Sequence, residues 1–91
     1  MQFSYDEAKN KSNMQKHGVP LSEAKLLEWD LLISTHDARR DYGEVREAGF
    51  APIANRLYCI VFTLRDNTIH VISLRKANER EVSKYAKNFD Q

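Results

Sequence analysis

Two adjacent cations, Arg75 and Lys76, stand where a strand is expected to end and a helix to begin. Asn78 has the type and position of the N-cap of that helix, and Glu81 follows at the third helical position, as in a capping box. Backbone N–H groups in the first turn of a helix add positive potential, which favours phosphate binding. The cations are therefore a candidate phosphate site, and the alternative is a pair of solvated charges at a strand end.

Glu44 and Arg46 form a second candidate pair, because residues two apart on a strand point to the same face. A carboxylate can accept a proton while a guanidinium binds a phosphate. The alternative is an ordinary surface ion pair worth about 0–1 kcal/mol. Arg65 is a further cation, but it lies far from Arg75 in an antiparallel hairpin, so the two need not share one site.

Lys16 and His17 end the first expected helix, where the helix dipole attracts a cation. His17 is a candidate general acid or phosphate contact with Lys16 beside it, and the alternative is a histidine that caps the helix. His70 lies between two apolar residues on a strand, a position typical of a buried, hydrogen-bonded histidine. Tyr85 belongs to an apolar helix stripe, which favours packing in the core over stacking on an RNA base.

The residue patterns do not indicate a metal or cofactor. The three histidines lack the spacing of zinc ligands, and no carboxylate cluster suggests magnesium. A glycine-rich phosphate loop is also missing. The single cysteine, Cys59, lacks the pattern of a nucleophile and excludes an internal disulfide, which favours a reducing compartment. We therefore expect no cofactor and a cytoplasmic location.

The composition is typical of one soluble domain covering residues 1–91. The hydrophobic fraction of 42% suffices for a packed core, and 30% of the residues are charged. No apolar run approaches the roughly 20 residues that cross a membrane, and the N-terminus lacks the features of a signal peptide. The net charge of +1 is too small to indicate nucleic-acid binding, so such a function would need a local cluster.

Hydrophobic periodicity and turn signals predict a short strand, two helices, four strands and a final helix. In chain order they cover residues 2–5, 6–17, 20–28, 31–36, 44–54, 57–65, 68–75 and a helix that follows Asn78. Residues 37–43 form a polar loop, and Gly18 is expected in the left-handed conformation after the first helix. Gly49 and Pro52 place their strand at a sheet edge or at a bulge.

The expected fold is α+β, with an antiparallel sheet of about four strands, two N-terminal helices and one C-terminal helix. The two strands of the hairpin over residues 57–75, joined by a tight turn at Asp66-Asn67, are apolar on both faces. A chain this short can cover one face well and the other only in part. Part of the second face is therefore left for a partner.

The sequence resembles the BrnT toxins of bacterial type II toxin–antitoxin modules. The resemblance rests on short stretches whose order and spacing run along nearly the whole chain. These are Tyr5-Asp6-Glu7-Ala8-Lys9, Asn13, Lys16–Val19, Glu23-Ala24, Gly43-Glu44-x-Arg46, Val61–Arg65, Ile72–Ala77, Glu79-Arg80-Glu81 and Tyr85. The chain departs from the family at His70, where Arg is usual, and at Leu74, in a motif that typically has Ser-Ala-Arg.

The resemblance implies a RelE-like fold and a ribonuclease that cuts RNA to inhibit translation and growth. It also implies a BrnA-like ribbon-helix-helix antitoxin, which neutralises the toxin and contacts the operator DNA for the complex. Metal-free cleavage requires a base, cations that stabilise a phosphorane, and an acid for the leaving oxygen. The candidate catalytic residues are Arg75, His17, Glu44 and Arg65. The candidate RNA-binding residues are Lys76, Arg46 and Lys16.

Arg75 is the foremost candidate for holding the scissile phosphate once the resemblance is considered. A second function stays open beside the ribonuclease. The chain could be the non-catalytic, partner-binding subunit of an autoregulatory complex whose DNA-reading half is another protein. The apolar hairpin and the polar first helix suit a protein partner under either hypothesis.

Overall fold

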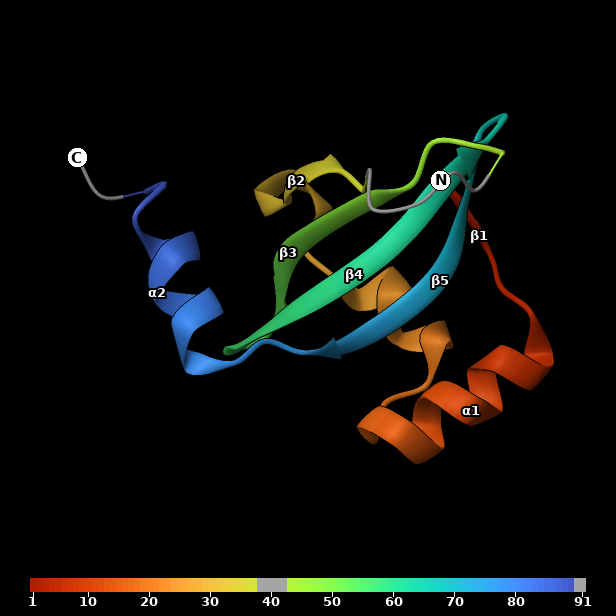
Figure 1. The fold of residues 1–91 in the computed structure, drawn as a ribbon, viewed down its shortest axis with the longest axis horizontal. Coiled ribbons are helices and arrows are strands. Elements are labelled where there is room, and N and C mark those ends of the chain that lie inside the picture. The colour runs from red at the N-terminus through yellow and green to blue at the C-terminus, as the bar shows by residue number, and fades with distance from the viewer. Residues whose placement is uncertain (38–42, 90–91) are drawn as a thin grey trace.

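The computed structural model describes residues 1–37 and 43–89. Most of the expected loop over residues 37–43 lies outside them. The elements follow one another along the chain as Figure 1 shows. They are β1 (Gln2–Ser4), α1 (Glu7–His17), two 3-10 helices η1 (Leu21–Leu26) and η2 (Trp29–Leu31), β2 (Ile33–His36), β3 (Glu47–Ile53), β4 (Arg56–Arg65), β5 (Thr68–Lys76) and α2 (Glu79–Ala86).

The five strands form one sheet in the order β1-β5-β4-β3-β2. The pairs among β2, β3, β4 and β5 are antiparallel, whereas β1 runs parallel to β5. The α+β class is therefore confirmed, but the expected sheet of about four antiparallel strands is wrong in detail. After β1 the chain passes through the helices and enters the sheet again at β2, which is the opposite edge. Strand β1 therefore forms the other edge, parallel to β5.

Helix α1 has the boundaries that its capping residues predict. The Asp6 carboxylate accepts a hydrogen bond from the Lys9 N–H at 3.0 Å, and Gly18 takes a left-handed conformation with φ of 74°. The helix lacks an apolar stripe, and the buried side-chain amide of Asn13 anchors it to the sheet instead. The Asn13 side chain bonds both the N–H (3.3 Å) and the carbonyl (2.6 Å) of Leu74, beyond the end of β1. Asn13 thereby takes the place of a neighbouring strand at that edge of β5.

The second expected helix forms as 3-10 turns rather than as an α-helix over residues 20–28. The side-chain amide oxygen of Asn10 accepts the Leu21 N–H at 2.6 Å and anchors the start of η1 to α1. Leu21, Ala24 and Leu27 are three residues apart, and a 3-10 helix has three residues per turn. This spacing puts all three buried side chains on one edge, against the sheet.

Strand β3 lies between β2 and β4, so the expectation that Gly49 and Pro52 mark a sheet edge is wrong. A Cβ at Gly49 would lie 2.6 Å from the Ser34 Cβ and 2.9 Å from the Ile33 carbonyl oxygen. Only glycine lets β2 approach so closely. Pro52 lies beyond the last β2 pair, so its missing N–H leaves no bond to β2 unmade. The bulge is in β5 instead, at the register shift opposite residues 61 and 62.

One face of the sheet is covered by α1 and η1 and forms the hydrophobic core. Leu21, Ile60, Val71 and Leu74 are its most deeply buried large apolar side chains. The Trp29 ring closes one side, packing against neighbouring aromatic rings at centroid distances of 5.3 and 5.6 Å.

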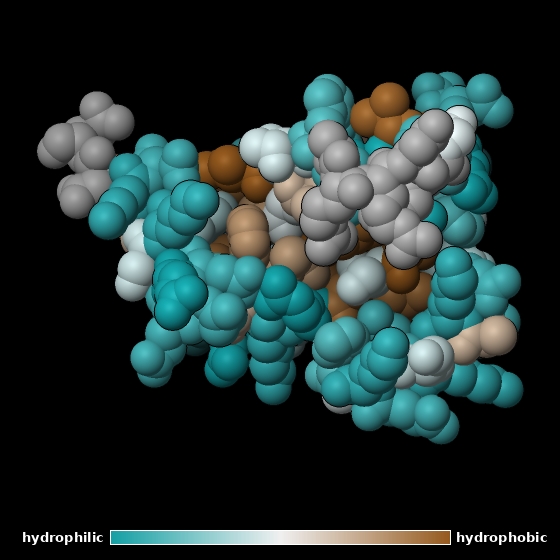
Figure 2. All heavy atoms as spheres, viewed as in Figure 1, coloured by the Kyte–Doolittle hydropathy of each residue, from teal (hydrophilic) through white to brown (hydrophobic). Residues whose placement is uncertain are grey.

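The opposite face, which we call the open face, is only partly covered. Residues paired across strands share a face, so two of its rows are Ile33–Phe50–Cys59–Arg75 and Thr35–Ala48–Val61–Ser73. Helix α2 stands at one end of the molecule (Figure 1) and has no buried residue. Figure 2 shows hydrophobic atoms exposed near the middle of the molecule, with hydrophilic residues around them.

Candidate functional site

The seven candidate residues fall into three separate places. Arg75 and Lys76 end β5 beside α2, while Glu44, Arg46 and Arg65 lie at the other end of the sheet. Arg75 pairs with Cys59 across the hairpin, and Arg65 is six residues further along β4, about 20 Å away. Lys16 and His17 end α1. The structure therefore does not bring these residues into one site.

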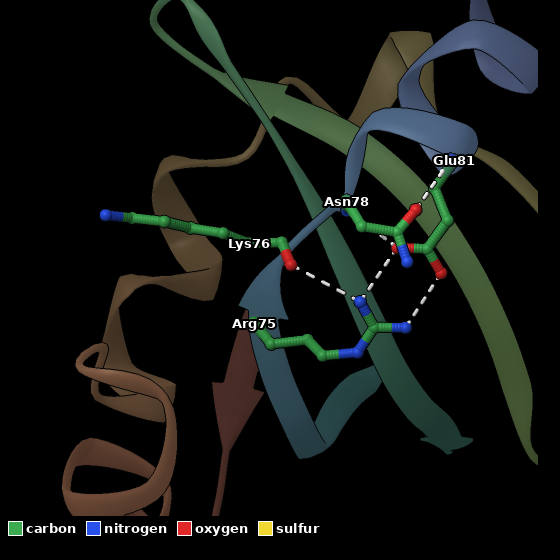
Figure 3. A network of polar contacts seen from close by, with 4 residues as sticks. All are labelled: Arg75, Lys76, Asn78 and Glu81. Carbon is green, nitrogen blue, oxygen red and sulfur yellow. Dashed lines mark hydrogen bonds and ion pairs between the residues drawn. The ribbon is translucent and has the colours of Figure 1, made fainter.

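Arg75 is held by Glu81 in a two-pronged ion pair (Figure 3). Both guanidinium Nη atoms donate to the two carboxylate oxygens at 2.9 Å, and Nη1 also lies 3.3 Å from the Lys76 carbonyl oxygen. The same carboxylate accepts the Asn78 N–H at 2.9 Å, which completes the expected capping box of α2. These bonds, above all those from Arg75, lower the pKa of Glu81 to about 2. Glu81 is ionised at neutral pH and neutralises Arg75.

Lys76 does not join Arg75 in a common site. Successive residues on a strand point to opposite faces, and Figure 3 shows the two side chains extending in opposite directions. Lys76 is exposed, whereas Arg75 is partly buried on the open face. The adjacent cations therefore act on different sides of the sheet.

The Glu44 carboxylate pairs with Arg65 rather than with Arg46 along one strand. Arg65 Nη2 and Nε donate to its two oxygens at 2.9 and 3.2 Å. Glu44 precedes β3, so the expectation that Glu44 and Arg46 share one face of a strand is wrong. The hydroxyl of buried Thr63 donates to the Val45 carbonyl at 2.7 Å and fixes this segment against β4.

Two further side chains, Arg46 and His70, interact electrostatically with the pair of Glu44 and Arg65. The hydrogen bonds from Arg65 lower the pKa of Glu44, and the charges of Arg65 and Arg46 add to the effect. Burial, and then the charge of Arg65, lower the pKa of His70. At neutral pH, Glu44 is therefore ionised and His70 is neutral. We call Glu44, Arg46, Arg65 and His70 the Glu44 cluster.

Ser4 holds the His70 ring in this cluster. Its hydroxyl lies 2.8 Å from His70 Nδ1, across the parallel pair of β1 and β5. The expected hydrogen bond of His70 is present, but the expected buried core position is wrong, because the ring is half-buried on the open face. Its place beside Arg65 could not be inferred from the sequence. The one sequence signal was the departure from Arg at this position. Ser4 carried no signal, because its contact depends on the pairing of β1.

Lys16 and His17 remain exposed at the end of α1. They border a shallow hollow of about 270 Å³ together with Ser73 of β5. Gly18, not His17, caps the helix through its backbone N–H, which bonds the Met14 carbonyl at 2.9 Å. These two side chains therefore lie near the sheet but away from both charged ends of the open face.

Within residues 1–37 and 43–89, no three His, Cys, Asp or Glu side chains gather where they could hold a metal ion. None of the helices in that part of the chain combines the length and the apolar character that a membrane span requires.

Comparison with protein families identifies the class of protein. Residues 5–81 match the ribonuclease toxins of type II toxin–antitoxin systems. Within that class the matching family is BrnT, and the chain belongs to the BrnT family. The family resemblance inferred from the sequence motifs is confirmed. No curated protein matches the chain at a significant level. A type II toxin acts with an antitoxin protein as its partner.

Proposed function

We propose that this toxin, RelE-like in its fold, cuts RNA without a metal ion at the Glu44 cluster. The observation that carries the proposal is the composition of the cluster at neutral pH. An ionised carboxylate and a neutral imidazole lie beside two guanidinium groups at one end of the open face. This set contains the proton acceptor and the cations that cleavage by a ribose hydroxyl requires.

In the proposed reaction, Glu44 accepts the proton of the 2′-hydroxyl as that oxygen attacks the phosphorus. Arg65 and Arg46 stabilise the charge of the phosphorane. The bond from phosphorus to the 5′-oxygen then breaks, and this oxygen takes a proton from water. The products are a 2′,3′-cyclic phosphate and a 5′-hydroxyl. When Arg65 turns to the phosphate, it releases Glu44 and makes that carboxylate a stronger base.

The remaining candidate residues bind RNA in this proposal. Arg75 meets a phosphate about 20 Å from the cut, on the same face, once the phosphate displaces Glu81. This differs from the expectation that Arg75 holds the scissile phosphate. Lys76 and Lys16 are exposed charges that attract RNA over longer distances, and exposed His17 contacts RNA beside Lys16.

Incubation of the antitoxin-free protein with RNA in EDTA tests the proposal. We expect cleavage products that end in a 2′,3′-cyclic phosphate under at least one of two conditions, namely without ribosomes or with ribosomes added. RNA that stays intact under both conditions at every protein concentration would contradict the proposal. The chain would then be the non-catalytic subunit of a regulatory complex.

We further propose that a BrnA-like ribbon-helix-helix antitoxin neutralises the toxin in the cytoplasm and supplies the DNA contact for repression. Exposed apolar side chains support a protein partner, among them Val82 (42% exposed) and Phe89 (51% exposed) of the C-terminal segment. Co-expression with the product of a neighbouring reading frame should restore growth and yield a complex. Growth arrest that such a neighbour does not relieve would contradict this assignment.

A further inference from the structure

A hollow of about 350 Å³ lies between α2 and the open face. Its lining includes Ile33 and Phe50 from the sheet and Lys84 and Tyr85 from α2. The volume is at the lower end of the range for small-molecule sites. The residues that take part in the proposed cleavage or bind RNA there do not line this hollow.

Two aromatic rings line the hollow, and one of them is fixed in place. The Tyr85 hydroxyl donates to the Leu31 carbonyl at 2.7 Å, and its ring packs against Phe89 with a centroid distance of 5.0 Å. Phe50 is half-buried in the middle of the sheet. Flat rings beside an apolar hollow offer a stacking surface for a nucleobase, and such stacking tolerates any base.

The rim of the hollow is positively charged. Arg80 and Lys84 line it and are exposed, and no carboxylate among the described residues pairs with either. Glu81 also lines the hollow, and in the RNA-free protein its charge is neutralised by Arg75 at 2.9 Å. When Arg75 turns to a phosphate, Arg80 and Lys84 still outnumber this one carboxylate. The excess of positive charge favours a ligand that joins a flat apolar ring to an anionic group.

We propose that this hollow binds one unpaired nucleobase of the RNA substrate, stacked on Phe50 and Tyr85, with the adjoining phosphates on Lys84 and Arg80. The inference rests on the proposed ribonuclease function. An amphipathic helix of a protein partner fits less well, since its anchoring side chains extend over several turns of 5.4 Å each. The hollow accommodates a single ring system.

The position of the hollow has a consequence for substrate choice. Arg75 is bonded to a residue of its lining, so the bound base lies near the end of β5. The Glu44 cluster is about 20 Å away along the same face. The enzyme therefore recognises single-stranded RNA that extends over several nucleotides, with one base held away from the cut.

Binding of a cut-resistant RNA by the full chain tests the inference. The probe is a fluorescent, 2′-O-methylated oligoribonucleotide of about 12 nucleotides, within the length that single-strand-binding folds cover. We expect Phe50→Leu to weaken binding about 5- to 150-fold, the range that one base–aromatic stack supplies. Phe50→Tyr should retain affinity. Lys84→Gln should weaken binding, whereas Lys25→Gln, an exposed charge on η1, should not.

Abasic substitutions separate a stacking role from a structural one. Removing one base at a time should weaken binding to the natural chain at a single position, and Phe50→Leu should abolish that positional effect. Equal affinities for all variants, or preferential binding of an acidic helical peptide in the hollow, would overturn the inference. Hollow-dependent binding without any cleavage would instead contradict only the proposed catalysis.

Discussion

Replacing Glu81 by Gln should lower stability and raise RNA affinity at the same time. Gln is the same size and can still accept the Asn78 N–H, so the capping box survives. What disappears is the negative charge that neutralises Arg75 and complements the dipole of α2. The substitution thus removes the negative charge of Glu81 and leaves its size and its hydrogen bond to Asn78 in place.

The loss of stability is limited because water reaches the ion pair. The side chains of Arg75 and Glu81 are 36% and 22% exposed, so the pair contributes about 0–1 kcal/mol. The acidic residue in the first helical turn contributes about 0.3–1 kcal/mol more. We expect Glu81→Gln to lower the free energy of unfolding by about 0.3–2 kcal/mol, measured by urea denaturation at pH 7.

The pH dependence of this loss follows from the lowered pKa of Glu81, which is about 2 in the folded chain. A carboxylate with a depressed pKa stabilises the folded state above its ordinary pKa of 4.5. That contribution is lost as the pH falls from 4.5 through 2. The difference in stability between the natural chain and Glu81→Gln should therefore vanish over this window.

The RNA affinity of Glu81→Gln should rise, although its stability falls. In the natural chain a phosphate must displace Glu81 from Arg75, so this contact releases no net counterion. In Glu81→Gln the displacement is no longer needed, so affinity should rise and the salt dependence of binding should steepen by about 0.7. Glu79→Gln is the matched control, because Glu79 is another acidic residue of the same first turn. Glu79→Gln should leave the RNA affinity and the salt dependence of binding nearly unchanged. If Glu81→Gln binds RNA with unchanged affinity and salt slope, Arg75 does not meet a phosphate.

Three further substitutions test the fold and the Glu44 cluster. Asn13→Ala leaves the buried backbone groups of Leu74 without partners and should cost about 2–5 kcal/mol in urea denaturation. Gly49→Ala places a Cβ 2.6 Å from Ser34 and should cost about 1–3 kcal/mol in the same assay. His70 has a pKa below 6.5, so lowering the pH through 6.5 should destabilise the natural chain. His70→Gln should show a smaller decrease of the thermal midpoint over that range.

Local signals in the sequence predicted much of the fold. Asp6 and Gly18 mark the ends of α1, and Asn78 with Glu81 marks the start of α2. The turn at Asp66, with φ of 55°, joins β4 and β5 as expected. Each of these features depends on residues within a few positions of one another, so a single segment contains the information.

Features that depend on distant segments were not predictable in the same way. The parallel pairing of β1 with β5 joins residues more than sixty positions apart, and it alone brings Ser4 to His70. The interior place of β3 depends on the close approach of β2 to Gly49. The site likewise required tertiary structure, because Glu44 meets Arg65 across 21 positions.

The cleavage rate of Glu44→Gln tests the central claim most directly. A single-turnover assay in EDTA should compare this variant with Glu28→Gln, an exposed carboxylate that is not part of the Glu44 cluster. We predict that Glu44→Gln cleaves RNA about 10²- to 10⁴-fold more slowly, the usual contribution of a general base, while binding it at least as tightly. Cleavage by Glu44→Gln at the rate of the natural chain would contradict the account, as would cleavage that EDTA abolishes.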